Sequence, residues 1–438
     1  MMARATVERL NGKPRVAFAT FGCKLNQWDT QVLERRVRDR FSVVDIHGQA
    51  DAYVINTCTV TGSSDAQARQ LIRRIMRERP GAGVFVTGCY AERAPDEISS
   101  MGDAVRVLGN SEKDRLAGLL SEGAVEEAPD EGPSGGAGPA VGRSRAHVAI
   151  QKGCDRGCTY CIVPFVRGPA RSFTPREVVS QVEELLAEGY REIVLTGTYL
   201  GDYASDSGGS TDLAGLVRYL SGIVADSARL RLSSIGPSDI TEDLIDAVAR
   251  SENVCRHFHV AFQSGDDAVL AAMRRGYDER SLRSALKLLT GAFPDCGLGG
   301  DAMVGFPGEG VDAFGRTAAI VEEFPFSYLH VFVFSARPGT RAAEYGRKVS
   351  PEIARSRSRE LRGVARRRAR DFSRRFVGRR VEVMAEGPSR KRGWLEGTSR
   401  EYLRVRFKGE EDLKGRLLPV QVEGAISGRL VSGSIPFN

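Results

Sequence analysis

Short apolar runs that alternate with amphipathic segments restrict the fold of this chain more than any other feature. In the first part of the 438 residues, apolar runs at 15–20, 52–55 and 83–87 are each followed by a segment with helical periodicity. Such alternation predicts parallel strands joined by helices. We therefore expect residues 1–124 to form a doubly wound α/β domain with a parallel sheet.

The alternation resumes in longer units after a break at 125–144, which is rich in Gly, Pro, Ser and acidic residues and which we interpret as a flexible linker. Strand-like runs at 147–150, 192–195, 230–233, 257–262, 298–304 and 328–334 are separated by helical segments such as 175–189 and 279–292. Six such units predict an incomplete (β/α)6 barrel over residues 145–370. Its active site is expected at the carboxyl ends of the strands.

The end of the chain differs in composition from the rest. Residues 355–380 contain twelve arginines against two acids and are helical in pattern as far as Gly378. Short alternating strands at 379–386, 393–399, 402–407 and 416–422 follow, as in a small all-β barrel, to which we assign residues 371–438. The net charge of +7 also favours a polyanionic partner.

Composition and segment lengths limit the cellular setting. A chain with 41% hydrophobic and 27% charged residues is globular and not disordered. The first 14 residues lack the apolar core of a signal peptide, and no stretch is apolar for long enough to cross a bilayer. We expect a cytoplasmic protein with no membrane partner, whose eight cysteines serve metal or redox chemistry instead of disulfides.

Three cysteines lie in one short run directly after the predicted strand 147–150. Cys154, Cys158 and Cys161 have the spacing C-x3-C-x2-C. Three thiolates can hold three corners of a four-iron cluster and leave one iron open to a small molecule. A structural zinc site needs a fourth ligand, and the nearest histidine, His147, lies upstream in the predicted strand. The run favours an iron-sulfur cluster over structural zinc.

Three further cysteines each follow one of the first predicted strands. These are Cys23, Cys58 and Cys89. Because loops at the carboxyl ends of parallel strands converge, three thiols far apart in sequence can form one site there. We interpret them as ligands of a second iron-sulfur cluster, again with one iron that the protein does not fill. Cys255 and Cys296 share neither spacing and are expected to be structural.

The motifs together resemble those of the radical S-adenosylmethionine methylthiotransferases over nearly the whole chain. The resemblance rests on the three-cysteine run with its aromatic Tyr160 and on the segments FGCKLNQWDT, INTCTVT, VTGCYAER, CTYCIVPFVRG, LTGTYLG, FQSGDD and VGFPGE. It implies two [4Fe-4S] clusters and S-adenosylmethionine as cofactors. The cluster on Cys154, Cys158 and Cys161 would cleave S-adenosylmethionine with an electron from an unidentified low-potential donor, and the resulting deoxyadenosyl radical would remove hydrogen from an unactivated carbon. The second cluster would carry or supply the sulfur, which another S-adenosylmethionine methylates.

The resemblance also implies residues that line the S-adenosylmethionine pocket: Tyr160, Thr196, Gly197, Gln263, Ser264, Asp301, Gly305 and Glu309. Three departures from the family pattern leave substrate contacts open. Gly236 stands where a glutamate is common, Ala261 where a proline is common, and RGPARSF replaces a more basic run after the cysteines.

The C-terminal segment resembles a TRAM domain, which is an RNA-binding barrel. Arg390, Lys391, Arg392, Arg404 and Arg406 would then face phosphates. Trp394 and Tyr402 could stack on bases, although each ring singly is expected to pack in the core of the barrel.

The expected substrate is a tRNA anticodon stem-loop, because an unpaired base can enter a deep pocket at little unstacking cost. The segments around Cys23 and Cys58 are most similar to the branch that modifies N6-threonylcarbamoyladenosine next to the anticodon. Isopentenyladenosine in tRNA and an aspartate of a ribosomal protein are the enzymatic alternatives. A non-catalytic RNA-binding protein with structural metal sites is the alternative of another class.

Overall fold

The computed structural model describes residues 13–122, 144–204 and 211–436. The chain divides into two compact units, of which the first comprises residues 1–141 and 162–168 and the second residues 142–161 and 169–438. The predicted linker at 125–144 lies outside the described residues except for Ser144.

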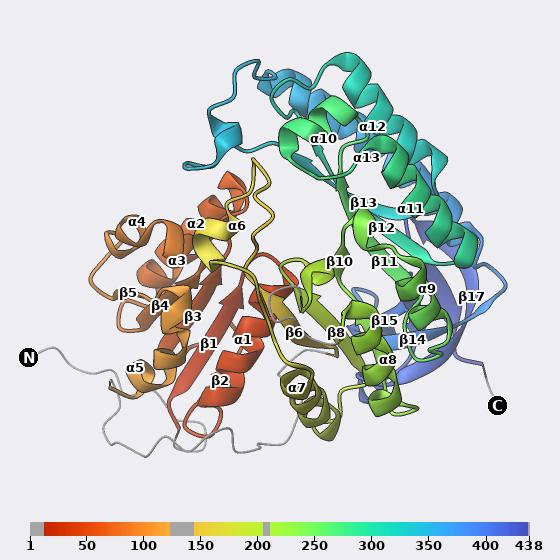
Figure 1. Ribbon diagram of the computed structural model, residues 1–438. Helices are drawn as coiled ribbons and strands as arrows, with labels where there is room; N and C mark the ends of the chain where they lie inside the picture. Colours follow the sequence, from red (N-terminus) through yellow and green to blue (C-terminus); the bar gives the residue numbers. More distant parts are fainter. Residues whose placement is uncertain (1–12, 123–143, 205–210, 437–438) are drawn as a thin grey trace, which may run out of the picture. The chain divides into compact units, whose positions relative to one another are not determined.

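The first unit is built on a five-stranded parallel sheet, which confirms the predicted doubly wound fold (Figure 1). Its strands are β1 (Arg15–Thr20), β2 (Ser42–Val44), β3 (Ala52–Thr57), β4 (Gly83–Gly88) and β5 (Val105–Val107), in the order β2-β1-β3-β4-β5. Its helices are α1 (Lys24–Val37), α2 (Gly62–Glu78), α3 (Cys89–Arg93), α4 (Pro95–Ser99), α5 (Leu116–Glu122) and α6 (Val163–Arg167). The short strands β2 and β5 were not expected from the sequence, because three residues carry too little periodicity.

Helices cover both faces of this sheet. Leu33 of α1 and Leu116 of α5 pack with Val54 on one face, whereas Ile72 of α2 and Ile98 of α4 belong to the core on the other. Alternate residues of each strand therefore pack into different cores. Because both faces are buried, successive residues of a strand are mostly apolar.

The second unit contains two four-stranded sheets that follow one another along the chain. The strands are β6 (Ala146–Lys152), β7 (Arg171–Ser172), β8 (Glu192–Gly197), β9 (Arg229–Leu232), β10 (Ser234–Ile235), β11 (His257–Gln263), β12 (Gly297–Val304) and β13 (Phe326–Val333). Their orders are β7-β6-β8-β9 and β10-β11-β12-β13. Only Ser233 separates β9 from β10, so the chain passes directly from the first sheet into the second. Apart from β7, which is antiparallel, the strands of the two sheets together form the expected incomplete barrel.

The barrel helices are α7 (Pro175–Ala187), α8 (Leu213–Val224), α9 (Glu242–Ala249), α10 (Asp267–Met273), α11 (Glu279–Ala292) and α12 (Val311–Glu323). The long α13 (Pro351–Arg374) follows them and crosses the predicted domain boundary at 370/371. Leu361 packs in the core of the incomplete barrel, and Phe372 packs in the core of the C-terminal barrel. One helix thus contributes to two cores.

The C-terminal barrel is closed by five strands, one more than the sequence predicted. They are β14 (Arg380–Pro388), β15 (Trp394–Ser399), β16 (Arg404–Lys408), β17 (Leu417–Ser427) and β18 (Leu430–Ser434), in the order β14-β15-β16-β18-β17. Within this unit, the buried Glu192 of β8 binds Arg229 and Arg231 at 2.6 and 2.7 Å. The same guanidiniums donate to the carbonyls of Thr398 and Ser399 at 2.8 and 2.9 Å, so a buried charge network joins the two barrels.

Candidate metal centres and active site

The run Cys154, Cys158 and Cys161 forms a loop directly after β6, and all three thiols are partly exposed. Arg275 lies 3.3 Å from Cys158 through its Nη1 atom and donates from Nη2 to the carbonyl of Ala261 at 2.9 Å. Because Ala261 lies near the end of β11, the loop is held at the carboxyl ends of the barrel strands, where the active site was expected.

Two side chains that sequence patterns did not single out anchor this loop. Gln151 donates from Nε2 to the carbonyl of Gly153 at 2.8 Å, and its Oε1 accepts from the backbone N–H of Thr198 at 3.1 Å. Arg156 pairs with Asp202 at 2.8 Å and lies 3.8 Å above the centroid of the Tyr199 ring. Only the fold brings these residues together, so spacing could not reveal them.

The unusual Gly236 provides room for this anchor. A Cβ atom at position 236 would lie 1.7 Å from the Tyr199 hydroxyl. Asp239, three residues later, accepts from the Gly236 N–H at 2.7 Å and lies 3.8 Å from Arg156. Tyr199 therefore fills the space that a glutamate at position 236 would need.

The residues expected to line the cofactor pocket fall into two groups. Tyr160 packs in the cluster that contains Met303, Thr196 is buried with no described partner for its hydroxyl, and Gly197 lies against Gln151. Gln263 has a positive φ of 65° at the end of β11. Thr196, Gly197 and Gln263 thus lie at the carboxyl ends of β8 and β11, and Tyr160 lies in the cysteine loop after β6.

The other group has protein partners. The Ser264 hydroxyl lies 3.2 Å from that of Thr317. Glu309 accepts from the Gly305 N–H at 2.7 Å and from Arg357 at 2.6 Å. Burial raises the pKa of the Glu309 carboxyl despite these donors. Ser264 and Glu309 support the turns that surround the strand ends.

Asp301 of β12 accepts from His259 at 2.9 Å and from His330 at 3.2 Å. Burial raises the pKa of the Asp301 carboxyl, but the two imidazoles outweigh it and hold that pKa well below its usual range. Asp301 is thus an anion between two histidines.

The first unit brings Cys23, Cys58 and Cys89 together at the carboxyl edge of its sheet. Cys23 precedes α1, Cys58 follows β3, and Cys89 begins α3 directly after β4. Burial and the neighbouring thiols Cys23 and Cys89 raise the pKa of Cys58 to about 11. Thiols that influence one another in this way resist deprotonation unless a metal binds them.

Cations of the same unit lie beside these thiols. Burial raises the pKa of the Cys89 thiol, whereas Arg167 of α6 and Lys113 oppose this rise. Asp29 binds Lys113 at 2.6 Å and Arg167 at 3.1 Å, and holds both cations in place. Two cations against one carboxylate leave positive charge beside Cys89.

Among the described residues, one group of three histidine or carboxylate side chains has its ligand atoms within 4.8 Å of one another, namely His259, Asp301 and His330.

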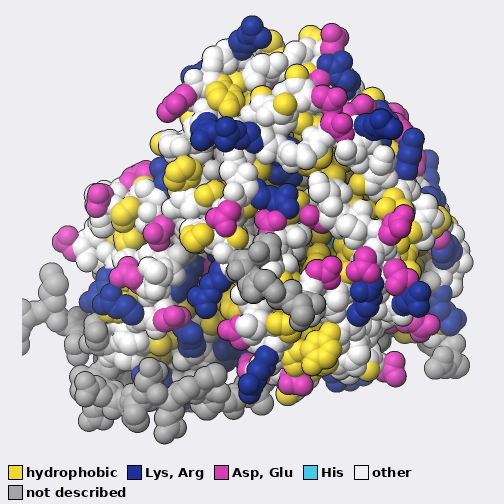
Figure 2. All heavy atoms as spheres, viewed as in Figure 1, with side chains coloured by type: hydrophobic (Ala, Val, Ile, Leu, Met, Phe, Trp, Pro, Cys, Tyr) yellow, Lys and Arg dark blue, Asp and Glu magenta, His cyan; other side chains and the backbone are white. Residues whose placement is uncertain are grey.

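Basic side chains are interspersed with acidic ones on the face shown in Figure 2. In the C-terminal barrel, Arg390, Lys391 and Arg392 are exposed in the turn between β14 and β15, with Lys391 4.1 Å above the Trp394 ring. Arg404 and Arg406 instead pair with Glu396. Tyr402 stacks on His257 of β11 at 4.1 Å, so it packs against the incomplete barrel rather than in the barrel's own core.

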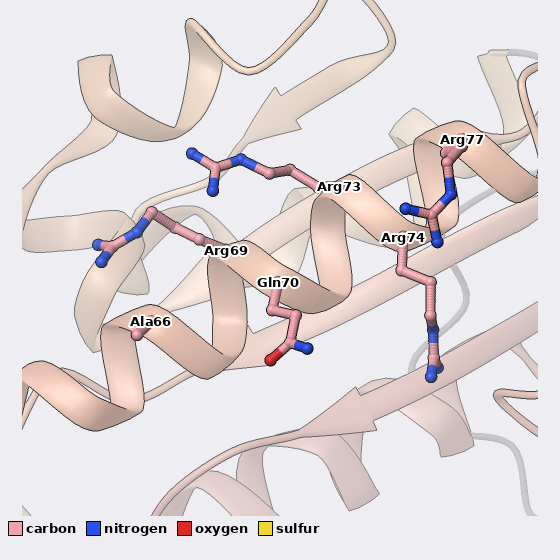
Figure 3. Close-up of a pocket in the computed structure, with 6 residues that line it drawn as sticks. All are labelled: Ala66, Arg69, Gln70, Arg73, Arg74 and Arg77. Carbon is pink, nitrogen blue, oxygen red and sulfur yellow. The ribbon is translucent and has the colours of Figure 1, made fainter.

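A hollow of about 360 Å³ lies along α2 in the first unit. Figure 3 shows the side chains that line it, with Arg69 and Arg73 extending to one side of the helix and Gln70 and Arg74 to the other. Ala66 and Arg77 complete the lining. Four of the six lining residues are arginines, so the hollow is basic.

Comparison with known proteins decides the family. Residues 148–321 match the radical SAM superfamily, and residues 15–109 match the family described as "Uncharacterized protein family UPF0004". The chain is 35% identical over 421 residues to the threonylcarbamoyladenosine tRNA methylthiotransferase MtaB of Bacillus subtilis, with 93% of each chain covered. The chain belongs to the radical S-adenosylmethionine methylthiotransferases. It is therefore an enzyme of this family, as its motifs predicted.

Two further matches place the enzyme within a wider group. It is 31% identical over 435 residues to the tRNA-2-methylthio-N(6)-dimethylallyladenosine synthase of Pelotomaculum thermopropionicum, covering 95% of this chain and 97% of that one. Its fold is similar to that of the radical S-adenosylmethionine methyltransferase TsrM of Kitasatospora setae, with a TM-score of 0.55, 15% identity, and coverage of 76% and 77%. Among the described helices, none is both long and apolar enough to cross a membrane.

Proposed function

We propose that this methylthiotransferase converts N6-threonylcarbamoyladenosine next to the anticodon of tRNA into its 2-methylthio derivative. The similarity to MtaB of Bacillus subtilis supports this choice of adenosine, and the second set of thiols carries the proposed methylthio transfer. A radical S-adenosylmethionine enzyme needs only the Cys154 loop to cleave its cofactor, whereas sulfur transfer needs a further site. Cys23, Cys58 and Cys89 lie together at the edge of the first sheet and can provide it.

We propose two [4Fe-4S] clusters, one on each set of three cysteines. When bound, they supply the electron that cleaves S-adenosylmethionine and the sulfur that is transferred. Gln151 and Arg156 hold the loop of Cys154, Cys158 and Cys161 against the strand ends. Arg167 and Lys113 balance negative charge beside Cys89.

For the cofactor pocket we propose a smaller lining than the family resemblance implies. We propose that Tyr160, Thr196, Gly197, Gln263 and Gly305 line it, while Ser264 and Glu309 shape the turns that hold these residues. The buried Thr196 hydroxyl has no hydrogen-bond partner among the described residues, which is the observation that supports its place in this lining.

The tRNA partner is supported by exposed basic side chains in both units. Arg390, Lys391 and Arg392 project from a turn of the C-terminal barrel, and Arg73 and Arg77 from α2. Arg404 and Arg406 share Glu396, so we expect them to contribute less to phosphate binding. A cytoplasmic location and a low-potential electron donor are parts of the same proposal.

Mass analysis of tRNA nucleosides from a deletion strain tests the substrate. We expect the 2-methylthio derivative of N6-threonylcarbamoyladenosine to disappear and its unmodified precursor to accumulate. Loss of 2-methylthio-isopentenyladenosine instead would assign the enzyme to the dimethylallyl branch named in the Pelotomaculum relative. Loss of neither, with a change in a ribosomal protein aspartate, would support the third branch.

A further inference from the structure

The inner face of the sheet β11–β12–β13 is unusually polar. Leu298, Ala302 and Val331 pack with the helices on the outer face. His259, Asp301 and His330 lie on the opposite face, since side chains alternate along a strand and Asp301 and His330 are register partners. Three ionisable groups therefore face the interior of the incomplete barrel.

These groups form an ordered chain of hydrogen bonds. The Tyr328 hydroxyl lies 2.9 Å from His259 Nδ1, and His259 Nε2 lies 2.9 Å from Asp301 Oδ1. The same oxygen accepts from His330 Nδ1 at 3.2 Å. Gly299 makes room for this chain, because a Cβ atom there would lie 2.1 Å from the Tyr328 ring. The chain fixes the orientation of the His330 imidazole.

His330 ends the chain with an open nitrogen. Its side chain is 56% exposed, whereas that of His259 is 4% exposed. Nδ1 binds Asp301, and no other described residue forms a hydrogen bond with the imidazole, so Nε2 is available to a ligand. Phe332, the next residue on the same face of β13, is 37% exposed and its ring lies 6.4 Å from that of His330.

This pair lies close to the loop of Cys154, Cys158 and Cys161. Met303, two residues beyond Asp301 on β12, packs in the same cluster as Tyr160 of that loop. Two residues of a strand span about 7 Å. A base whose reacting carbon lies at the strand ends would place its other substituents within reach of His330 and Phe332.

We propose that His330, oriented by Asp301, is a specificity residue that hydrogen bonds the N6 substituent of the substrate adenosine, with Phe332 beside the base. The inference rests on the proposed function and names the residue that would recognise the N6 substituent. A threonylcarbamoyl substituent carries carbonyl, hydroxyl and carboxylate oxygens that can pair with Nε2. An isopentenyl substituent has none, so it would remove water from Nε2 of His330 without replacing the lost hydrogen bond, which disfavours its binding.

The test measures binding of three anticodon stem-loop RNAs that differ only at this adenosine, which is N6-threonylcarbamoylated, unmodified or N6-isopentenylated. Full-length protein is compared with His330→Leu, His330→Gln and the matched control His47→Leu, which changes an exposed histidine of the first unit. We expect His330→Leu to weaken binding of the threonylcarbamoyl RNA about tenfold and to change binding of the unmodified RNA little. His330→Gln should restore part of the preference, and His47→Leu should keep all of it.

The outcomes separate this inference from the proposed function. Wild-type protein that binds all three RNAs equally would contradict the proposed substrate. Wild-type preference for the threonylcarbamoyl RNA that survives in a folded His330→Leu variant would overturn the role of His330 alone. Stoichiometric zinc that is lost with His330→Leu would also overturn it, since His259, Asp301 and His330 would then form a metal centre.

Discussion

The two sets of three cysteines are brought together by different structural routes. Cys154, Cys158 and Cys161 lie within eight residues of one loop, so the chain itself keeps them near one another. Cys23, Cys58 and Cys89 come from three loops of a sheet and meet only when β1, β3 and β4 pair in register. We therefore expect the positions of the first three thiols to depend little on substitutions elsewhere, whereas those of the second three depend on the packing of the whole unit.

The largest expected effect follows from removing one thiol from each set. Cys158→Ala should lower formation of 5′-deoxyadenosine at least about 10³-fold, because the cofactor loses the site that cleaves it. Cys58→Ala should keep 5′-deoxyadenosine formation and lose the methylthio product. Both products are measured by mass spectrometry in anaerobically reconstituted protein. Cys296→Ala, which removes a buried thiol outside both sets, is the control and should keep both products. Equal loss of 5′-deoxyadenosine in both variants would show that the two sites do not act separately.

A pair of glycine substitutions sharpens the contrast between packed and local sites. Gly22 has a φ of 99°, and a Cβ atom there would lie 2.5 Å from Cys58 Cβ. Gly157 has a φ of 63° with no atom within 4 Å of the added Cβ. We expect Gly22→Ala to cost about 1–3 kcal/mol and to reduce bound iron, and Gly157→Ala to cost about 1 kcal/mol with iron retained. Urea unfolding measures the free energy of unfolding, and iron analysis measures the bound iron of each variant. Equal iron loss in the two variants would contradict the difference between the two sites.

The charges beside the second set offer a smaller perturbation. Arg167→Leu removes one of the two cations that bind Asp29, while Lys113 remains. We expect the free energy of unfolding to fall by about 1–3 kcal/mol, because a buried carboxylate loses a charged partner. Arg115→Leu, at an exposed pair with Glu112, should change it by no more than about 0.5 kcal/mol. Similar losses in both variants would show that the buried pair is not special.

The smallest effect is expected at Gly236, which lies against the Tyr199 ring on which Arg156 of the cysteine loop stacks. Gly236→Ala must displace the Tyr199 hydroxyl and with it the stacking of Arg156. We expect a cost of about 1 kcal/mol and weaker binding of S-adenosylmethionine in equilibrium dialysis. Gly222→Ala in α8, where an added Cβ contacts nothing, is the matched control. Unchanged cofactor affinity in Gly236→Ala would show that Tyr199 does not help to position the loop.

Much of the architecture could be predicted because its signals are local. The strand 15–20 and the helix 279–292 match β1 and α11 residue for residue, since apolar periodicity and flanking caps lie within each segment. The strands β2, β5, β7, β10 and β18 were missed. They are short or weakly patterned, and their pairing is decided by neighbours distant in sequence.

The amino-acid sequence by itself determined the alternation of strands and helices, the local cysteine loop and the arginine-rich approach to the last barrel. Only the tertiary structure decided that Arg156 and Gln151 anchor that loop, that Arg167 lies beside Cys89, and that His259, Asp301 and His330 join into one chain. The physical reason is the sequence separation over which each signal acts. Periodicity and spacing act over a few residues, whereas a hydrogen bond between strands depends on register and on which face each side chain takes.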